Sequence, residues 1–434
     1  MSKQDKKELR QQIACEWLEE NYLNYGSLRH DVVTDRLQIR VADLHSLEDG
    51  SAYSLEFRGK ENWRNLTDKD INTMVCQCVA EKGVNISTNE MWTALKSDMV
   101  PAVHPLRAWL DGLRPYTADQ PDWIDFVAQQ VKVKTSDEEA KGDKARGEEL
   151  WRACFKKWFV AMVASWMKDE VVNHTVLVLV GRQGIFKTTW LDNLIPPELR
   201  AYSSKLPLSG QISKDDRLRL CENGLLNIDE LDAMCGREMN IVKSLLTSTD
   251  VNERAAYGRL KERRVRLASF CASTNKREFL TDITGNRRWL PFEVESIQNP
   301  FHTIIPYERL YAQAKALVEE GVFSYWFDME EMEVLEAHNE EFRAQENEEQ
   351  LLPILFDVPA EGGGEFMTTA QISERLVTYG NIKKPMPLNR LGVLLGTAGY
   401  KDVRHKIGGV RTRGWLVYQR HSDEIGRIKD HFKE

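Results

Sequence analysis

Short apolar runs alternate with helical patterns in the middle of the chain. Runs at 175–181, 224–230 and 265–274 are rich in Val, Leu, Ile and other apolar residues, and segments with helical spacing lie between them. Apolar strands separated by helices are typical of a parallel sheet covered on both faces. A segment with many large apolar side chains, 150–167, is predicted to form a long helix ahead of them. The pattern therefore predicts an α/β core over residues 150–324.

The pattern before this core is mixed. Alternation over 30–41 predicts a strand, whereas 68–83 and 87–99 have apolar residues at helical spacing and Ser, Thr or Asp near their starts. We therefore expect a mixed α/β domain over residues 1–135. The following segment, 136–149, is polar, charged and without an apolar anchor, so it is expected to be a linker.

The pattern after the core changes twice. Residues 325–364 are strongly acidic and helical in spacing, which predicts a solvated connector. In 365–434, a capped helix from Thr368 and a second helix from Leu388 are followed by a hairpin that turns at Gly408 and Gly409. Two helices and a hairpin predict a winged-helix-like module.

Charge distinguishes this last region from the rest. It contains thirteen Lys and Arg against seven Asp and Glu, whereas the chain as a whole has a formal charge of −8. As the only basic domain it is the best candidate for contact with duplex DNA, and docking to a protein is the alternative. The cations expected to contact phosphate are Arg404, Lys406, Arg411 and Arg413.

Composition sets the broad class. The chain has 434 residues, of which 42% are hydrophobic and 29% charged, as in an ordinary soluble protein. No apolar run is long enough to cross a bilayer and the start is charged, so we expect a cytoplasmic location. The seven cysteines are scattered, and only Cys76 and Cys78 lie close together, which favours free thiols over a structural metal.

A phosphate-binding pattern follows the first apolar run. From Gly181 the residues nearly match G-x-x-x-x-G-K-[ST], but Phe186 stands where the second glycine is expected. In such a loop the backbone N–H groups bind phosphates, Lys187 would neutralise the β- and γ-oxygens, and Thr188 would hold Mg²⁺. Because glycine suits that backbone best, Phe186→Gly is expected to leave nucleotide binding intact or improve it. The nucleotide-binding residues are expected to be Gly181, Gln183, Gly184, Ile185, Phe186, Lys187, Thr188 and Thr189.

Polar residues follow the other two runs at the spacing that an ATPase needs. Asp229 and Glu230 end the second run, where one carboxylate can organise Mg²⁺ and the next can polarise the attacking water. Asn275 directly follows the third run and can touch the γ-phosphate. Arg287 and Arg288 follow, and either can stabilise the charge of the transition state. Surface acids and ordinary salt bridges are the alternatives, but four elements in this order are more specific than any one.

The order of these motifs resembles the virulence-associated protein E family, which comprises superfamily 3 helicase-type ATPases of phages and bacterial mobile elements. The likeness covers about 150–313 most strongly. It implies an AAA+-like P-loop ATPase core that assembles into a ring, commonly a hexamer, with active sites shared between subunits. In that arrangement the catalytic residues Lys187, Asp229, Glu230 and Asn275 act in cis, together with Thr188, while Arg287 or Arg288 acts in trans.

The resemblance also implies a hairpin that projects into the central channel of the ring. Cations beside an aromatic side chain are what a single-stranded DNA channel requires. An exposed charged hairpin is the alternative. The channel residues would be Arg254, Tyr257, Arg259, Lys261, Arg263 and Arg264.

The sequence therefore predicts an ATP-dependent DNA helicase or translocase in replication of a phage or mobile element, with ATP and Mg²⁺ as cofactors. An alternative is a nucleotide-gated DNA-binding or assembly protein with slow or no hydrolysis, which Phe186 favours. A small-molecule P-loop kinase is less favoured, because it gives the Arg pair and the basic hairpins no purpose.

Overall fold

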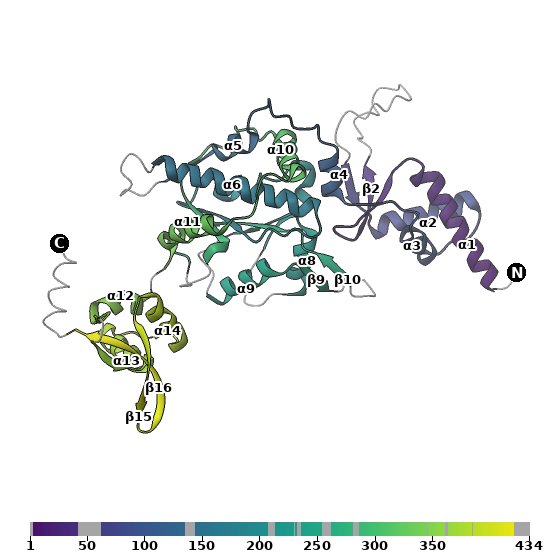
Figure 1. Cartoon of the computed structure of the whole chain (residues 1–434). Helices are drawn as coiled ribbons and strands as arrows, with labels where there is room; N and C mark the ends of the chain where they lie inside the picture. The colour runs from purple at the N-terminus through teal and green to yellow at the C-terminus, as the bar shows by residue number, and fades with distance from the viewer. Residues whose placement is uncertain are drawn as a thin grey trace. The chain divides into compact units, whose positions relative to one another are not determined.

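The computed structural model describes residues 3–41, 62–134, 144–206, 213–229, 231, 236–253, 262–280, 286–344, 346–360, 363–383 and 385–420. It divides into two compact units (Figure 1). The first consists of Met1–Arg277 and Arg288–Met332, and the second of Glu278–Arg287 and Glu333–Glu434.

The first unit begins with a small α/β module. Its four-stranded sheet has the order β3-β2-β1-β4, and α1, α2 and α3 contribute to one apolar core that includes Trp17, Leu18 and Met91. The two predicted helices are confirmed, and each starts with a capping box, Thr67 with Asp70 and Ser87 with Glu90. The elements are α1 (Lys3–Leu18), η1 (Glu19–Leu23), β1 (Leu28–Asp31), β2 (Arg36–Val41), β3 (Asn62–Asn65), α2 (Asp68–Lys82), α3 (Thr88–Leu95) and β4 (Ala102–Val103).

The single strand predicted over 30–41 is wrong, because the chain reverses within it. β1 and β2 pair antiparallel, with Leu28 opposite Ile39. The turn between them is built by the buried Asp31 carboxylate, which accepts hydrogen bonds from the backbone N–H groups of Val33 at 2.9 Å and Thr34 at 3.3 Å. Such a side-chain turn continues the polar–apolar alternation without continuing the strand.

The centre of the first unit is a six-stranded sheet in the order β5-β12-β6-β11-β8-β7. All strands from β12 to β7 run parallel, as the apolar runs predict, and β5 pairs antiparallel with β12. The strands are β5 (Val131–Val133), β6 (Val176–Val180), β7 (Ser203–Lys205), β8 (Leu225–Ile228), β11 (Ser269–Thr274) and β12 (Trp289–Ile297).

Helices cover both faces of this sheet (Figure 1). α5, α6 and α10 pack together on one side, and α8 and α9 lie on the other. The other elements of this part of the chain are α4 (Pro105–Asp111), α5 (Trp123–Ala128), α6 (Lys144–Met167), α7 (Lys187–Asp192), η3 (Pro197–Tyr202), α8 (Lys214–Glu222), α9 (Gly236–Thr247), β9 (Asp250–Glu253), β10 (Glu262–Val265), η5 (Asn286–Arg288), α10 (Tyr307–Glu320) and α11 (Met329–Asn339).

The predicted long helix is α6, and its indole rings fix it to the sheet. Trp158 donates to the carbonyl oxygen of Phe270 at 3.0 Å, and Trp166 donates to that of Gly224 at 3.2 Å. A Cβ atom at Gly224 would lie 2.7 Å from the Trp166 ring, so this position requires glycine. The helix begins at Lys144, which is inside the segment expected to be a linker, 136–149.

The side chain of Arg266 is fully buried at the carboxyl end of α9. Arg266 donates to the carbonyl oxygens of Leu245 at 3.0 Å and Leu246 at 2.8 Å, near the carboxyl end of α9, and to that of Asn173 at 2.6 Å. Burial lowers the pKa of its guanidinium to about 9, so the group remains charged at neutral pH. A cation is favourable at a helix carboxyl terminus, and Arg266 thereby anchors α9.

The second unit is a helical module with a small sheet. β14 and β15 both pair antiparallel with β16, and β13 pairs with the far end of β16. The predicted capped helix, second helix and hairpin are present as α13, α14 and β15–β16, and Ile407 faces Val410 across the Gly408–Gly409 turn. The elements are η6 (Glu340–Phe342), α12 (Asn347–Leu355), β13 (Phe356–Asp357), β14 (Glu365–Met367), α13 (Thr369–Gly380), α14 (Leu388–Thr397), β15 (Lys401–Ile407) and β16 (Val410–Gln419).

The acidic segment 325–364 does not act as a connector throughout. Leu352 and Leu355 of α12 are buried in the same core as Leu391 and Trp415, so α12 is part of the carboxyl-terminal module. Within the described ranges, no helix is both long and apolar enough to cross a membrane.

Candidate nucleotide-binding site

A sharp loop joins β6 to α7 at the carboxyl edge of the sheet. The backbone N–H of Gly181 donates to the carbonyl oxygen of Thr274 at 3.1 Å, which ties the loop to β11. Position 181 requires glycine, because a Cβ atom there would lie 3.0 Å from the Val294 carbonyl oxygen. Gly184 has a positive φ of 85°. Gly181, the first glycine of the motif, and Gly184, a further glycine of the loop, thus allow the strand-to-helix turn that the sequence predicts.

Phe186 adopts the backbone conformation that glycine favours. Its φ is 68° and its ψ is 17°, in the left-handed region, directly before the first residue of α7. That conformation costs an L-residue roughly 1–2 kcal/mol. The sequence departs from the glycine pattern here, but the loop keeps the backbone geometry that the pattern requires.

The Lys187 amine lies inside this loop. Its side chain is buried, with 7% exposure. The amine donates to the carbonyl oxygens of Gly181 and Arg182, both at 2.7 Å, and to Asn275 Oδ1 at 3.1 Å. Lys187 therefore joins the loop after β6 to the residue that follows β11, and these two polar positions predicted from separate motifs are in direct contact.

Three oxygen-bearing side chains converge beside Lys187. Thr188 Oγ1 lies 3.1 Å from Asp229 Oδ1 and 2.9 Å from Ser273 Oγ. Ser273 Oγ also donates to Asp229 Oδ1 at 3.1 Å. These oxygens come from α7, the end of β8 and β11. Hydroxyl and carboxylate oxygens are the ligands that Mg²⁺ prefers, so the donor set fits that ion.

A second lysine completes the cluster. Lys205, at the end of edge strand β7, contacts Asp229 Oδ2 at 2.6 Å. Burial by itself would raise the pKa of Asp229, but the ion pair with Lys205 and the hydrogen bonds from Ser273 and Thr188 outweigh it and hold that pKa below its usual value. The carboxylate is therefore ionised at neutral pH.

Sequence reasoning missed Ser273 and Lys205. Ser273 has a weak signal, because it is one of two hydroxyl residues that end a strand of otherwise small and apolar residues. Lys205 has no signal of its own. Its contact depends on β7 pairing in parallel with β8, with Lys205 opposite Asn227, two residues before Asp229.

For the remaining predicted site residues within the described ranges, the structure gives burial but no contact within the cluster described above. Glu230 lies outside the described residues, Gln183 is exposed, and Ile185 and Thr189 are partly buried. Arg288 is partly buried in the first unit, and Arg287 is exposed in the second. Among the residues that the structure describes, neither arginine forms an ion pair.

In the segment predicted to form the channel hairpin, β9 and β10 pair as an antiparallel ribbon. Arg254, Tyr257, Arg259 and Lys261 lie outside the described residues. Arg263 is exposed and pairs with Asp250 at 2.8 Å. Arg264 is more buried, pairs with Glu222 at 3.2 Å and contacts the Val33 carbonyl oxygen, so it holds the base of the ribbon.

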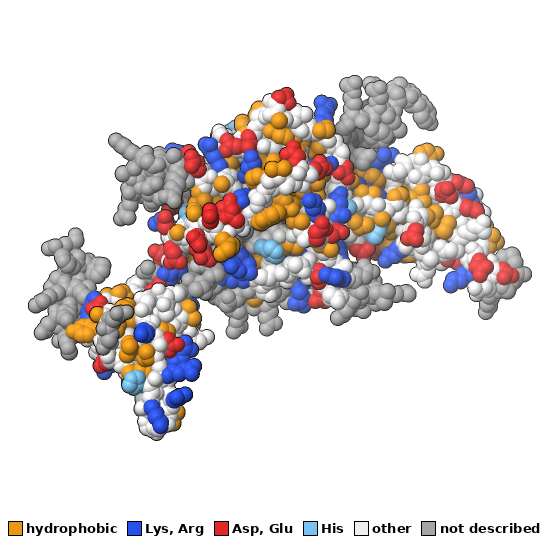
Figure 2. Space-filling view, in the orientation of Figure 1, with side chains coloured by type: hydrophobic (Ala, Val, Ile, Leu, Met, Phe, Trp, Pro, Cys, Tyr) orange, Lys and Arg blue, Asp and Glu red, His pale blue; other side chains and the backbone are white. Residues whose placement is uncertain are grey.

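The basic hairpin of the second unit presents its cations on one face. Arg404 lies opposite Arg413, and Lys406 lies opposite Arg411. Directly opposite residues of an antiparallel pair share a face, and alternate residues along a strand return to it. All four cations therefore share one face of the hairpin. Figure 2 shows Lys and Arg side chains gathered on this part of the module. Arg413 is also paired with Asp402 at 2.8 Å.

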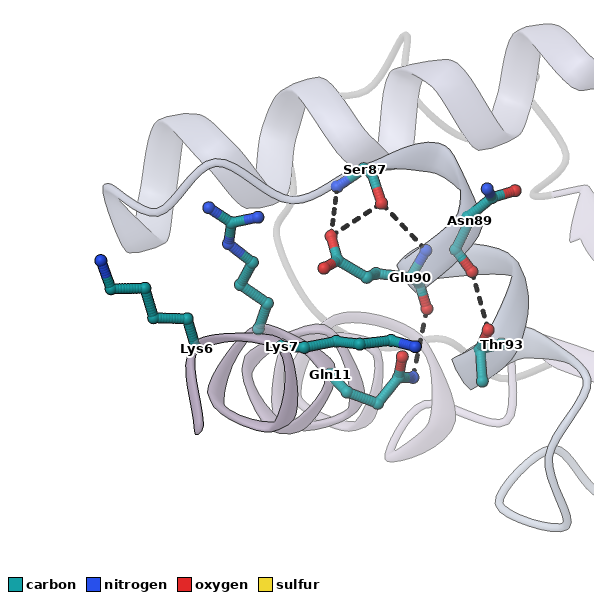
Figure 3. Close-up of a pocket in the computed structure, with 8 residues that line it drawn as sticks. Lys6, Lys7, Gln11, Ser87, Asn89, Glu90 and Thr93 are labelled. Carbon is teal, nitrogen blue, oxygen red and sulfur yellow. Dashed lines mark hydrogen bonds between the residues drawn. The ribbon is translucent and has the colours of Figure 1, made fainter. Parts of the chain in front are cut away.

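A separate pocket lies in the amino-terminal module (Figure 3). Lys6, Lys7 and Gln11 of α1 face the first turn of α3. Its polar atoms already serve the fold: the Glu90 carboxylate caps α3 through Ser87, and Gln11 donates to the Glu90 carbonyl oxygen at 3.2 Å.

The fold and the site define a mixed α/β protein with a buried lysine in a strand-to-helix loop. Residues 141–344 match the model of the virulence-associated protein E-like domain. This match bears out the resemblance to the virulence-associated protein E family for that part of the chain.

Other comparisons are more distant. An apo structure of the NrS-1 C-terminal region, residues 305–718, superposes with a TM-score of 0.43 at 10% identity and covers 91% of this chain and 97% of that chain. An A-form apo structure of the same region has a TM-score of 0.42 at 12% identity and covers 91% and 98%. No curated protein matches the chain significantly.

Proposed function

We propose that this chain is an ATP-dependent DNA helicase or translocase that acts in replication of a phage or mobile element. The observation that carries the proposal is the cluster of Lys187, Asn275 and the Thr188–Ser273–Asp229 oxygens. They meet at the carboxyl ends of three adjacent parallel strands. In open α/β sheets this edge is where ligands bind.

The proposed chemistry is attack of water on the γ-phosphate of ATP. Lys187 would exchange its bonds to loop carbonyl oxygens for bonds to β- and γ-phosphate oxygens. Thr188 and Asp229 would hold Mg²⁺, which neutralises phosphate charge when bound. Asn275 would contact the γ-phosphate, and Glu230 would polarise the attacking water. We further propose that Arg287 or Arg288 completes the site of a neighbouring subunit in a ring, commonly a hexamer.

We assign the sheet to an AAA+-like P-loop core and the second unit to a winged-helix-like DNA-binding module. The order α12, β13, β14, α13, α14, β15, β16 supports the latter, because it ends in two helices and a cationic hairpin. Single-stranded DNA would pass along the β9–β10 ribbon, and duplex DNA would contact the β15–β16 hairpin.

Steady-state ATP hydrolysis with and without single-stranded DNA tests this proposal. A translocase is expected to hydrolyse ATP several-fold faster when the strand is present, because strand movement and hydrolysis are coupled. A fork substrate in the same buffer should be unwound only with ATP and Mg²⁺. Hydrolysis that single-stranded DNA does not alter would contradict the translocase proposal.

A second candidate is a nucleotide-gated DNA-binding protein with slow or no hydrolysis. Two observations favour it: the strained backbone of Phe186 and the ion pair that Lys205 makes with the proposed Mg²⁺ ligand Asp229. Under this candidate, ATP changes DNA affinity while turnover stays negligible. DNA binding measured with ATP and with a non-hydrolysable analogue would then give the same affinity.

A further inference from the structure

A second aromatic ring lies beside the strained residue of the loop. Phe301, in the segment between β12 and α10, is 75% exposed. Its ring centroid is 6.2 Å from that of Phe186, and the two ring planes meet at 82°, a T-shaped contact. Such pairs are favourable, and the edge-on arrangement leaves ring faces free for another partner.

The exposed ring is presented by an ordered turn. The backbone N–H of Phe301 donates to Asn299 Oδ1 at 3.0 Å, and the N–H groups of His302 and Thr303 donate to the Asn299 carbonyl oxygen at 3.0 Å. Ile304, in the same segment, is 81% exposed but has no ring to stack. The turn therefore holds Phe301 beside the loop after β6.

Phe186 keeps an aromatic ring at a position whose backbone conformation favours glycine. Glycine would take its φ of 68° without strain, so the ring is what phenylalanine adds at this position. Backbone strain of this kind concentrates at functional sites. Phe186 immediately precedes Lys187, so the ring pair adjoins the loop in which the Lys187 amine would bind phosphates.

We infer that Phe186 and Phe301 form a subsite for the base of the nucleoside triphosphate. The inference rests on the proposed function and adds the part of the ligand that the phosphate cluster does not contact. Phe301 offers an exposed ring on which the base stacks, and Phe186 contacts that ring. Stacking depends on the area of the π-face, so the subsite favours purines over pyrimidines without selecting one purine by hydrogen bonds.

Calorimetric titration of the full chain with Mg²⁺-ATP and with Mg²⁺-tripolyphosphate tests the subsite, because tripolyphosphate has no base. Phe301→Ala is expected to weaken ATP binding about tenfold, the loss of one stacked base. Tripolyphosphate binding should stay within about twofold of the wild type. Ile304→Ala, an equally exposed residue of the same segment, should change neither affinity.

Phe186→Gly is the complementary variant, because it removes the ring and keeps a residue suited to the same φ. The subsite predicts weaker ATP binding and unchanged tripolyphosphate binding, whereas the sequence alone predicts that this change leaves nucleotide binding intact. Unchanged ATP affinity in Phe301→Ala, or equal loss for both ligands, would overturn the subsite and leave the proposed function standing. A wild-type chain that binds neither ligand would overturn both.

Discussion

Asp229 is the residue on which most of the site converges. It receives hydrogen bonds from two hydroxyl groups and an ion pair from Lys205, which keep it ionised although burial opposes that charge. A carboxylate in this state is ready to bind a cation over the whole neutral range. The ion pair with Lys205 helps to keep the Asp229 carboxylate ionised, and it also occupies one of the two carboxylate oxygens.

Lys205→Met should move the acid limb of the ATPase pH profile to higher pH. Without the ion pair, burial raises the pKa of Asp229, so protonation begins nearer to neutral and Mg²⁺ binding is lost earlier. The measurement is kcat/KM for ATP at saturating Mg²⁺ between pH 4.5 and 8. Lys132→Met, which removes an exposed lysine paired with Glu295, is the matched control. An acid limb that coincides in all three proteins would contradict the role of Lys205.

At the scale of elements, α4 depends on a histidine that must stay neutral. His104 is the amino-terminal cap of this helix, and its Nδ1 accepts the backbone N–H of Arg107 at 3.3 Å. Burial, helped by the charge of Arg107, lowers the pKa of His104 to about 4. A protonated ring could not accept that hydrogen bond.

The free energy of unfolding should therefore fall as pH drops from about 6.5 towards 4. Since the folded pKa lies below the unfolded one, the unfolded chain takes up a proton first, and the stabilisation is complete only above the unfolded value. After allowance for partial exposure the loss is up to about 2 kcal/mol. His104→Asn keeps a capping side chain that does not titrate, so urea unfolding of this variant should show a flatter profile. Parallel profiles for both proteins would contradict this.

The β15–β16 hairpin provides a test with an internal control. Arg404→Ala and Lys406→Ala remove cations from the shared face, whereas Lys401→Ala removes one from the opposite face of the same strand. Each of the first two changes should weaken duplex DNA binding and reduce the salt dependence by about one unit of slope. Lys401→Ala should do neither. Equal effects from all three would show that the face does not matter.

The helices and strands also show which parts of the fold and of the site can be predicted from the sequence. Strands β6, β8 and β11 are fully buried runs of mostly apolar or small residues, and α6 is rich in tryptophan. The sequence pattern therefore predicts these elements and places Lys187, Asp229 and Asn275 at one edge. The β1–β2 turn escapes prediction because the Asp31 carboxylate, and not a glycine, closes it. The role of Lys205 cannot be predicted from the sequence pattern, because it depends on the pairing of β7 with β8.

At the scale of the whole molecule, the proposed ring predicts complementation between inactive subunits. Lys187→Ala removes the phosphate-binding amine from one subunit, and Arg288→Ala removes the proposed trans arginine from another. Mixed at different ratios, the two proteins should regain part of the ATPase activity, because some interfaces then combine an intact lysine with an intact arginine. No recovery at any ratio would contradict a shared site in which Arg288 acts.

The central claim is that the chain hydrolyses ATP at the Lys187 cluster. Its most direct test is the steady-state ATPase rate, with single-stranded DNA present, of the wild type, Lys187→Ala and Lys69→Ala, the last being an exposed lysine of α2. Wild type and Lys69→Ala should hydrolyse ATP alike, and Lys187→Ala should be slower by roughly a hundredfold or more. Hydrolysis that survives in Lys187→Ala, or that is missing from the wild type, would contradict the account.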